Sequence, residues 1–165
     1  MTMETIADPH QFIGELISGI PTAILTTVDD HGHMESRPMA TLEYSFEGSV
    51  WFLASRSSRL VSHLIHNSQV NVSYCHPGGK TFVSISGTAE IVDDQKLIRQ
   101  LWRPLFSTWF EHGPQDPDLT LIRVTTVSAD CWEHQPTPFH LPHGAQPPWI
   151  DGGSPMHGIY RRVTW

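Results

Sequence analysis

The chain has 165 residues, of which 39% are apolar, so it has the length of one domain with a substantial core. Seventeen acidic residues against ten basic ones give a net charge of −7, which excludes broad electrostatic binding of nucleic acid or of anionic membranes. No run approaches the roughly 18 apolar residues of a membrane-spanning helix. The first basic residue is Arg37, so no secretory signal is expected and the predicted location is cytoplasmic. Cys75 and Cys131 are expected to be free thiols.

The first third of the chain predicts one helix followed by three strands. Asp8 has the position of an N-cap, Pro9 begins the first helical turn, and Gln11 is placed to complete a capping box. The helix is expected to end at Gly19. The strands, rich in β-branched residues and separated by turns, are expected over residues 22–28, 33–44 and 49–54.

The middle and the last third of the chain are expected to contain both helices and strands. A helix is expected over residues 57–67, because Leu60, Val61, Leu64 and Ile65 share one face. A second helix, capped by Asp93, should extend to about Trp102. The other expected elements are strands over 69–75 and 80–92, a helical piece over 105–111, and strands over 119–127 and 129–133.

Hairpin-length turns between most strands predict antiparallel pairing, and a sheet that curls into a small barrel satisfies its edges best. The expected fold is therefore α+β, mainly β. It is a six-stranded antiparallel split β-barrel with flanking helices. The composition changes after Glu133, since residues 134–158 hold six prolines and four glycines. We expect a barrel domain over residues 1–133. Residues 134–165 should form a Pro/Gly/His-rich C-terminal extension, packed on the barrel through Trp149, Ile150 and Tyr160 or trailing from it.

A candidate phosphate site is the segment Ser55-Arg56-Ser57-Ser58-Arg59, which follows one strand and opens a helix. A helix N-terminus offers free N–H groups and a positive dipole end, and hydroxyls and guanidinium groups add further donors. The alternative interpretation is ordinary capping by Ser57 or Ser58, with arginines that are simply solvated.

A second unusual segment, Glu35 to Thr41, places Pro38 inside a predicted strand. Proline removes one ladder hydrogen bond, so it marks an edge or a bulge where a flat hydrogen-bonding ligand could supply partners. The alternative is an edge strand that Pro38 protects against aggregation, with Arg37 in water.

Taken together and in chain order, these segments resemble the flavin-binding split barrel of the pyridoxamine 5'-phosphate oxidase superfamily, and more narrowly its general stress protein branch. The resemblance extends from about Phe12 to Glu133. The residues that carry it are Thr22–Asp29, Ser36–Thr41, Trp51-Phe52 with Ser58-Arg59, Val70–Tyr74, Val83–Ala89 and Leu101–Pro104.

The resemblance implies a homodimer with FMN, or FAD as the alternative flavin, at the subunit interface. By this likeness Arg37, Ser58 and Arg59 would bind the phosphate with help from Ser55, and a tryptophan would cover the ring from the partner chain. The residues implied for the ring are the backbone of Pro38, Met39, Ala40 and Thr41, and Trp102 or Trp109. Two departures matter: the chain lacks the basic C-terminal substrate sequence of a true pyridoxamine 5'-phosphate oxidase, and Phe82 lies near a position where that enzyme has glutamine.

The function implied is a flavin-dependent oxidoreductase with a small-molecule redox partner and an unknown substrate. No side chain stands out as catalytic, because the sequence has no nucleophile elbow and no Gly-rich nucleotide loop. One alternative is a flavin-carrying or flavin-sensing stress protein without turnover. Another is a flavin-free barrel that binds a metal in its tail, for which the ligand candidates are Cys131, His134, His140 and His143.

Overall fold

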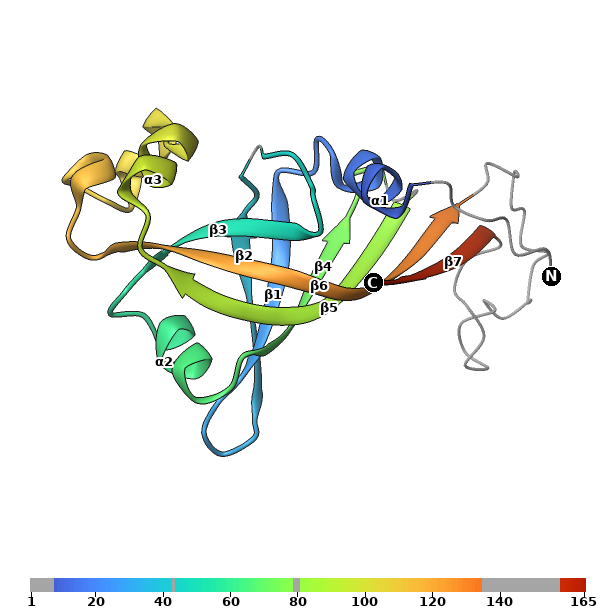
Figure 1. The fold of residues 1–165 in the computed structure, drawn as a ribbon, viewed down its shortest axis with the longest axis horizontal. Coiled ribbons are helices and arrows are strands. Elements are labelled where there is room, and N and C mark those ends of the chain that lie inside the picture. Colours follow the sequence, from blue (N-terminus) through green and yellow to red (C-terminus); the bar gives the residue numbers. More distant parts are fainter. Residues whose placement is uncertain (1–7, 43, 79–80, 135–157) are drawn as a thin grey trace, which may run out of the picture.

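One antiparallel sheet with short helices around it makes up the computed structural model, which describes residues 8–42, 44–78, 81–134 and 158–165 (Figure 1). The helices are α1 (Pro9–Ile17), α2 (Arg59–His66) and α3 (Gln95–Leu101), with 3-10 helices η1 (Pro104–Thr108) and η2 (Gly113–Gln115). The strands are β1 (Thr22–Val28), β2 (Met34–Ala40), β3 (Ser49–Ser55), β4 (Gln69–Cys75), β5 (Thr81–Val92), β6 (Leu119–His134) and β7 (Gly158–Thr164).

The strand order is β2-β1-β4-β5-β6-β3, and β7 also pairs with β6. Every pairing is antiparallel, as the hairpin-length turns predicted. The sheet does not close, because β2 lies at one end of this order and β3 at the other. The predicted α+β split barrel with flanking helices is confirmed.

Strand β6 is one continuous strand, although the sequence pattern predicted two strands separated at Ser128. Opposite β5, Ser86 faces Ser128 and Gly87 faces Thr126, so Val127 is an extra residue, and the ladder continues past it. A β-bulge bends and twists a strand without ending it. A Cβ atom on Gly87 would collide with the backbone carbonyl of Thr125, which explains the glycine at this position.

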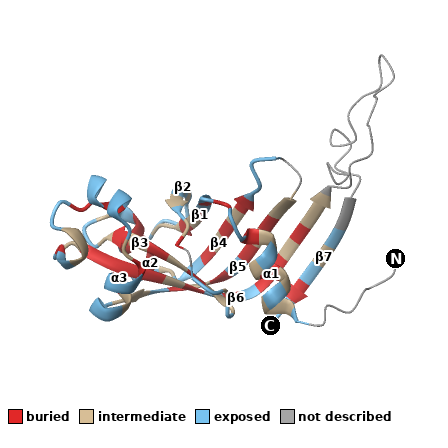
Figure 2. Cartoon of the chain, turned by 90° about the horizontal axis from the view of Figure 1, so that it is seen from above, coloured by how far each residue is buried: buried red, intermediate tan, exposed pale blue. Residues whose placement is uncertain are grey.

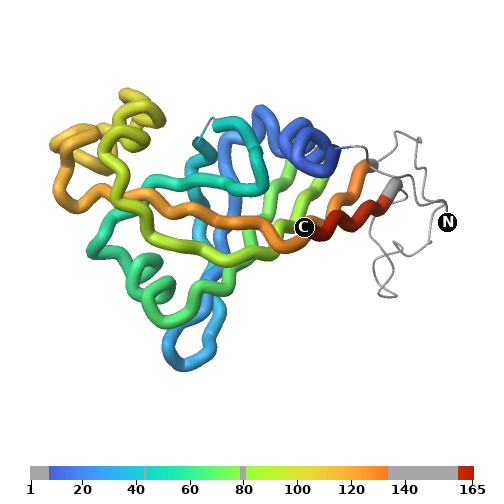
Figure 3. Tube along the Cα trace, in the orientation of Figure 1, coloured from blue at the N-terminus to red at the C-terminus, as the bar shows by residue number. Residues whose placement is uncertain are grey.

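Strand β7 was not predicted, and it pairs with the second half of β6, from Ser128 to His134 (Figure 3). The Tyr160 hydroxyl donates to Asp130 at 2.6 Å, and its ring packs on Trp132 with the centroids 5.6 Å apart. Tyr160 thus contacts β6 through both its hydroxyl and its ring. Trp149 and Ile150 lie outside the described residues.

Two capping predictions need correction. Asp8 caps α1 as expected, but the Gln11 side chain donates to Glu15 at 2.8 Å, one turn ahead, instead of bonding back to Asp8. Helix α3 is capped by Asp94, whose carboxylate accepts from two backbone N–H groups at 2.9 and 3.0 Å. Asp93, the predicted cap, forms an ion pair with Arg56 at 2.6 Å. The helical piece expected over residues 105–111 is the 3-10 helix η1.

The apolar residues form two clusters, and in β1, β3 and β4 buried positions alternate with less buried ones (Figure 2). The larger cluster lies between the sheet and the helices α1 and α2. Its fully buried members include Ile13, Leu25, Phe52 and Ile85. The smaller cluster joins α3 and η1 to the first residues of β6. None of the helices in the described part of the chain is long and apolar enough to span a membrane.

Candidate functional site

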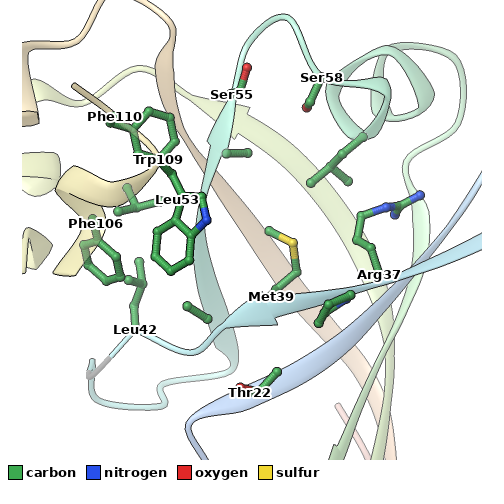
Figure 4. A pocket seen from close by; sticks show the side chains of 14 residues that line it. Thr22, Arg37, Met39, Leu42, Leu53, Ser55, Ser58, Phe106, Trp109 and Phe110 are labelled. Atoms are coloured by element: carbon green, nitrogen blue, oxygen red, sulfur yellow. The ribbon is translucent and has the colours of Figure 1, made fainter. Parts of the chain in front are cut away.

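A cavity of about 640 Å³ lies where β2 and β3 face each other across the open side of the sheet (Figure 4). Arg37 and Ser58 are at one end of it, and Phe106, Trp109 and Phe110 are at the other (Figure 4). The remaining lining residues are Thr22, Pro38, Met39, Ala40, Leu42, Leu53, Ala54, Ser55 and Leu60. The cavity therefore combines a polar end that carries a cation with an apolar, aromatic end.

Strand β2 supplies one wall because successive side chains of a strand point to opposite faces. Arg37 and Met39 share the half-buried face with Glu35, while Ser36, Pro38 and Ala40 are exposed. Since β2 pairs only with β1 among the described strands, Pro38 lies on an edge strand, which both interpretations allow.

The Arg37 side chain is held from several sides. Its Nη1 donates to the Thr27 hydroxyl at 2.9 Å and to the Leu25 carbonyl at 3.4 Å, and its Nη2 lies 3.5 Å from the Glu35 carboxylate. Burial lowers the pKa of Arg37, and Glu35 opposes that shift. The guanidinium group remains charged at neutral pH, because even a lowered arginine pKa lies far above it.

A single carboxylate oxygen, Glu35 Oε2, joins Arg37 to helix α2. Arg59 Nη2 donates to it at 2.7 Å, and His63 Nε2 lies 4.0 Å away. The other ring nitrogen of His63 shares a hydrogen bond of 2.9 Å with the Thr27 hydroxyl, which also accepts from Arg37. The two arginines predicted for the phosphate therefore do meet, but with a carboxylate between them.

The β3–α2 turn is anchored by Asp118, the residue before β6. The Ser57 N–H and hydroxyl donate to its carboxylate at 2.9 and 3.1 Å, and the Ser55 hydroxyl also donates to it. These bonds, Ser55's first, lower the pKa of Asp118 below its ordinary value. The Ser58 hydroxyl accepts from the Val61 N–H at 3.3 Å and caps α2, as one of the two interpretations expected.

The two candidate tryptophans have different surroundings. Trp109 is 62% exposed and lines the cavity. Trp102 packs edge-to-face on Phe106 and Phe110, with centroid distances of 5.8 and 6.5 Å, as part of the smaller apolar cluster. Trp102 is not among the residues that line the described cavity.

Seven of the ten residues predicted for the flavin site line this cavity, namely Arg37, Pro38, Met39, Ala40, Ser55, Ser58 and Trp109. Thr41 instead lines a neighbouring cavity, and its N–H donates to the Pro21 carbonyl at 3.0 Å. Arg59 is not among the lining residues; its side chain is 80% exposed and is linked to Arg37 by the Glu35 carboxylate. Phe82 lies on β5 opposite Trp132 and is not among the lining residues.

Sequence reasoning assigned no role to Glu35, Thr27, His63 or Asp118. Strand alternation could have indicated Glu35, because it lies two residues before Arg37 and so on the same face. Thr27 pairs directly with Glu35 across the β1–β2 hairpin. Asp118 is about sixty residues from the turn that it holds, so no local pattern points to it.

One of the four candidate ligands of the metal hypothesis lies in the core. Cys131 is 1% exposed inside the larger core cluster, and burial raises its pKa to about 12. The side chains of His134, His140 and His143 lie outside those described. Within the described residues, no three His, Cys, Asp or Glu side chains form a cluster that could hold a metal ion.

An open antiparallel barrel with a cavity at its unpaired edges defines the class of split-barrel proteins. The chain belongs to the pyridoxamine 5'-phosphate oxidase like family, whose model matches residues 8–142. The predicted resemblance, including that to general stress proteins, is confirmed by the relatives below.

Protein bli-3 of Neurospora crassa is 31% identical in an alignment of 117 residues that covers 65% of this chain and 56% of that protein. The chain therefore spans little more than half the length of this relative. The solved general stress FMN/FAD binding protein of Xanthomonas citri is 27% identical, with a TM-score of 0.67, over 80% of this chain and 93% of that one. General Stress Protein 26 of Bacillus anthracis shares the fold at 22% identity and a TM-score of 0.65, over 73% and 90% of the two chains.

Proposed function

We propose that the chain is a flavoprotein of the general stress protein type that binds FMN in the cavity between β2 and β3. The observation that carries this proposal is the two-ended lining, with Arg37 and Ser58 opposite an aromatic, apolar end. Its volume of about 640 Å³ falls within the range of roughly 300–1,000 Å³ that is common for small-molecule sites. The Xanthomonas citri relative, which is named as FMN/FAD binding, supports a flavin as the ligand.

At the polar end, Arg37, Arg59 and Ser58 would hold the phosphate, with the start of α2 adding its positive dipole end. Arg37 has a fixed position because Thr27 and Leu25 accept from it. Ser55 would act indirectly, since its hydroxyl is bonded to Asp118 and so helps to fix the turn.

At the apolar end, the backbone from Pro38 to Thr41 would follow the edge of the flavin ring, and Met39, Leu42 and Leu53 would exclude water from it. Trp109 is the better candidate than Trp102 for covering the ring, because its exposed indole borders the cavity of its own chain, whereas the resemblance implied a tryptophan from the partner chain. Leu105, on η1, is a second exposed apolar residue and lies four positions before Trp109. We propose that a second copy of the chain packs here, so that the functional protein is a cytoplasmic homodimer with the flavin at its interface.

A bound flavin would supply hydride or electron transfer, and the protein would contribute position and electrostatics. We propose an oxidoreductase that acts on a small molecule other than a vitamin B6 phosphate. The residues that line the described cavity include no carboxylate, imidazole, thiol or amine. Proton transfer at the ring would then depend on water, on the substrate or on a side chain of the second copy.

That lining also favours a second candidate, a flavin-carrying or flavin-sensing protein without turnover. General acid–base catalysis needs a titratable side chain within hydrogen-bond reach of the reacting atoms. Among the described lining residues, the hydroxyls and the Arg37 guanidinium do not titrate near neutral pH.

The test begins with the absorbance spectrum of the purified full chain, followed by chromatography of the released chromophore against FMN and FAD standards. Titration of the flavin-free protein with FMN then gives the affinity. Failure to bind any flavin would refute the proposal. With flavin bound, reduction by NADH or NADPH well above the rate of free FMN supports the oxidoreductase, and a rate no higher supports the carrier.

A further inference from the structure

We propose that Glu35 is a built-in competitor for the flavin phosphate, so that this carboxylate sets the affinity of the site for anionic ligands. The inference rests on the proposed function, since it concerns the same polar end of the cavity. It adds a role for a residue that does not line the cavity itself.

The geometry places Glu35 where an anion would bind. Its Oε2 lies 2.7 Å from Arg59 Nη2 and 3.5 Å from Arg37 Nη2, so one oxygen contacts both guanidinium groups. His63 Nε2 lies 4.0 Å from the same atom. Groups from β2 and α2 therefore converge on one carboxylate, in the way that they would converge on a phosphate oxygen.

The charges predict competition. Arg37 and Arg59 together carry two positive charges, and Glu35 cancels one of them. A phosphate monoester is close to doubly negative at neutral pH. It would therefore meet a site with one net positive charge and a neighbouring carboxylate that repels it.

The backbone of Glu35 is fixed, because β2 is paired with β1 along its whole length, and the Glu35 side chain is only 30% exposed. Arg59 is the movable partner, since 80% of its side chain is exposed. Arg37 keeps its bond to Thr27 at 2.9 Å. Binding of a phosphate would thus turn Arg59 from Glu35 toward the ligand, while Arg37 stays in place.

The opposite role would be that of a positioning residue, in which Glu35 holds the two arginines ready for the ligand. The two roles predict opposite signs: removal of the charge strengthens phosphate binding if Glu35 competes and weakens it if Glu35 positions. The variant Glu35→Gln keeps the shape and removes the charge. Glu133→Gln is the matched control, because Glu133 also pairs with an arginine, Arg161 at 2.6 Å, and is 33% exposed against 30% for Glu35.

The experiment measures the Kd of FMN and of riboflavin, which lacks the phosphate, for the full chain and both variants by flavin fluorescence. The expected result is at least tenfold tighter FMN binding by Glu35→Gln, with the riboflavin affinity unchanged. Glu133→Gln should match the unmodified chain for both ligands. Unchanged or weaker FMN binding by Glu35→Gln would overturn the inference and leave the proposed function intact.

A second readout does not depend on flavin. Inorganic phosphate should raise the Tm of Glu35→Gln more than that of the unmodified chain or of Glu133→Gln, because a bound ligand stabilises the folded state. If this occurs while no flavin binds to any of the proteins, the proposed function fails and the anion competition stands. An equal rise in Tm for all three proteins would refute the competition.

Discussion

The Ser57 backbone N–H donates to the Asp118 carboxylate at 2.9 Å, and through this bond the residue before β6 holds the turn that follows β3. The Ser55 and Ser57 hydroxyls donate to the same carboxylate. Because Ser55 and Ser58 border the cavity, the shape of its polar end depends on a residue distant in sequence.

Replacement of Asp118 by Asn should reduce stability in a pH-dependent way. The hydrogen bonds from Ser55 and Ser57 lower the pKa of Asp118 from its ordinary value of 3.8. The resulting stabilisation is fully present above that value and is lost as the pH falls through the lower pKa of the folded state. Asp118→Asn should therefore have a lower Tm than the unmodified chain at pH 7, and the gap should narrow below about pH 4. Thermal unfolding monitored by circular dichroism across this range tests it.

The control is Asp30→Asn, in the β1–β2 turn, where the carboxylate is 59% exposed. Its Tm should follow that of the unmodified chain at each pH. A gap for Asp118→Asn that stays constant from pH 7 to pH 3 would show that the carboxylate charge has no part in anchoring the turn.

Loss of Arg59 should weaken FMN binding without weakening riboflavin binding. A hydrogen bond to a charged group contributes roughly 1.5–3 kcal/mol, so Arg59→Ala should raise the Kd of FMN about tenfold or more. Arg37→Ala should have at least the same effect, because Arg37 is fixed by Thr27 and by the Leu25 carbonyl. Isothermal titration calorimetry with both ligands measures the difference.

Arg162→Ala serves as the comparison, because this β7 arginine is 60% exposed and lies 3.8 Å from Asp130. FMN affinities that are equal for the unmodified chain, Arg59→Ala and Arg37→Ala would place the phosphate elsewhere.

Substitution of the two candidate tryptophans should affect different properties, fold stability for Trp102 and flavin binding for Trp109. Trp102→Ala removes a half-buried indole packed on Phe106 and Phe110, so it should destabilise the fold by about 2 kcal/mol or more. Trp109→Ala removes a side chain that is 62% exposed, so it should leave the free energy of unfolding nearly unchanged and weaken FMN binding. Urea unfolding and FMN titration of both variants provide the comparison. Equal effects on FMN affinity from two well-folded variants would argue against a special role for Trp109.

The bulge on β6 should make Gly87 intolerant of a side chain. In Gly87→Ala, the new Cβ would overlap the Thr125 carbonyl, and neither strand can shift without breaking the β5–β6 ladder. We expect a loss of about 3 kcal/mol or more in the free energy of unfolding. Gly14→Ala, in α1, is the matched substitution: its Cβ would lie 3.3 Å from the Phe46 Cβ, and helix propensity favours alanine by about 1 kcal/mol. Urea unfolding that finds Gly87→Ala as stable as Gly14→Ala would contradict this account.

The hairpin β1–β2 and the helix α2 were predictable because their signals are local. Alternating and β-branched residues mark the strands, and the face that carries Leu60, Val61 and Leu64 marks the helix. Ile65, expected on the same face, is instead 69% exposed. The continuity of β6 was not predictable in this way. Its bulge at Val127 interrupts the alternation, and only pairing with β5 restores the ladder beyond it.

The residues of the candidate site divide in the same way, into those with a local sequence signal and those that depend on distant contacts. Sequence patterns placed Arg37 on an edge strand and Ser58 at the start of a helix, since each position has its own local signal. The contacts of Glu35 with Arg59 and of Asp118 with Ser57 join segments that the fold brings together from a distance. A pattern read along one segment cannot show which carboxylate will lie beside its cation.

Strand β6 has two neighbours in succession along one edge: β3 as far as Thr125 and β7 from Ser128 onward. Trimming the chain before Gly158 would spare the half of β6 that pairs with β3 but would expose the backbone N–H and C=O groups of the other half. Such an exposed edge recruits strands from neighbouring molecules. The last strand satisfies these groups of β6, and as the new edge strand it carries Arg161 and Arg162, charged residues of the kind that disfavour pairing with strands of other molecules.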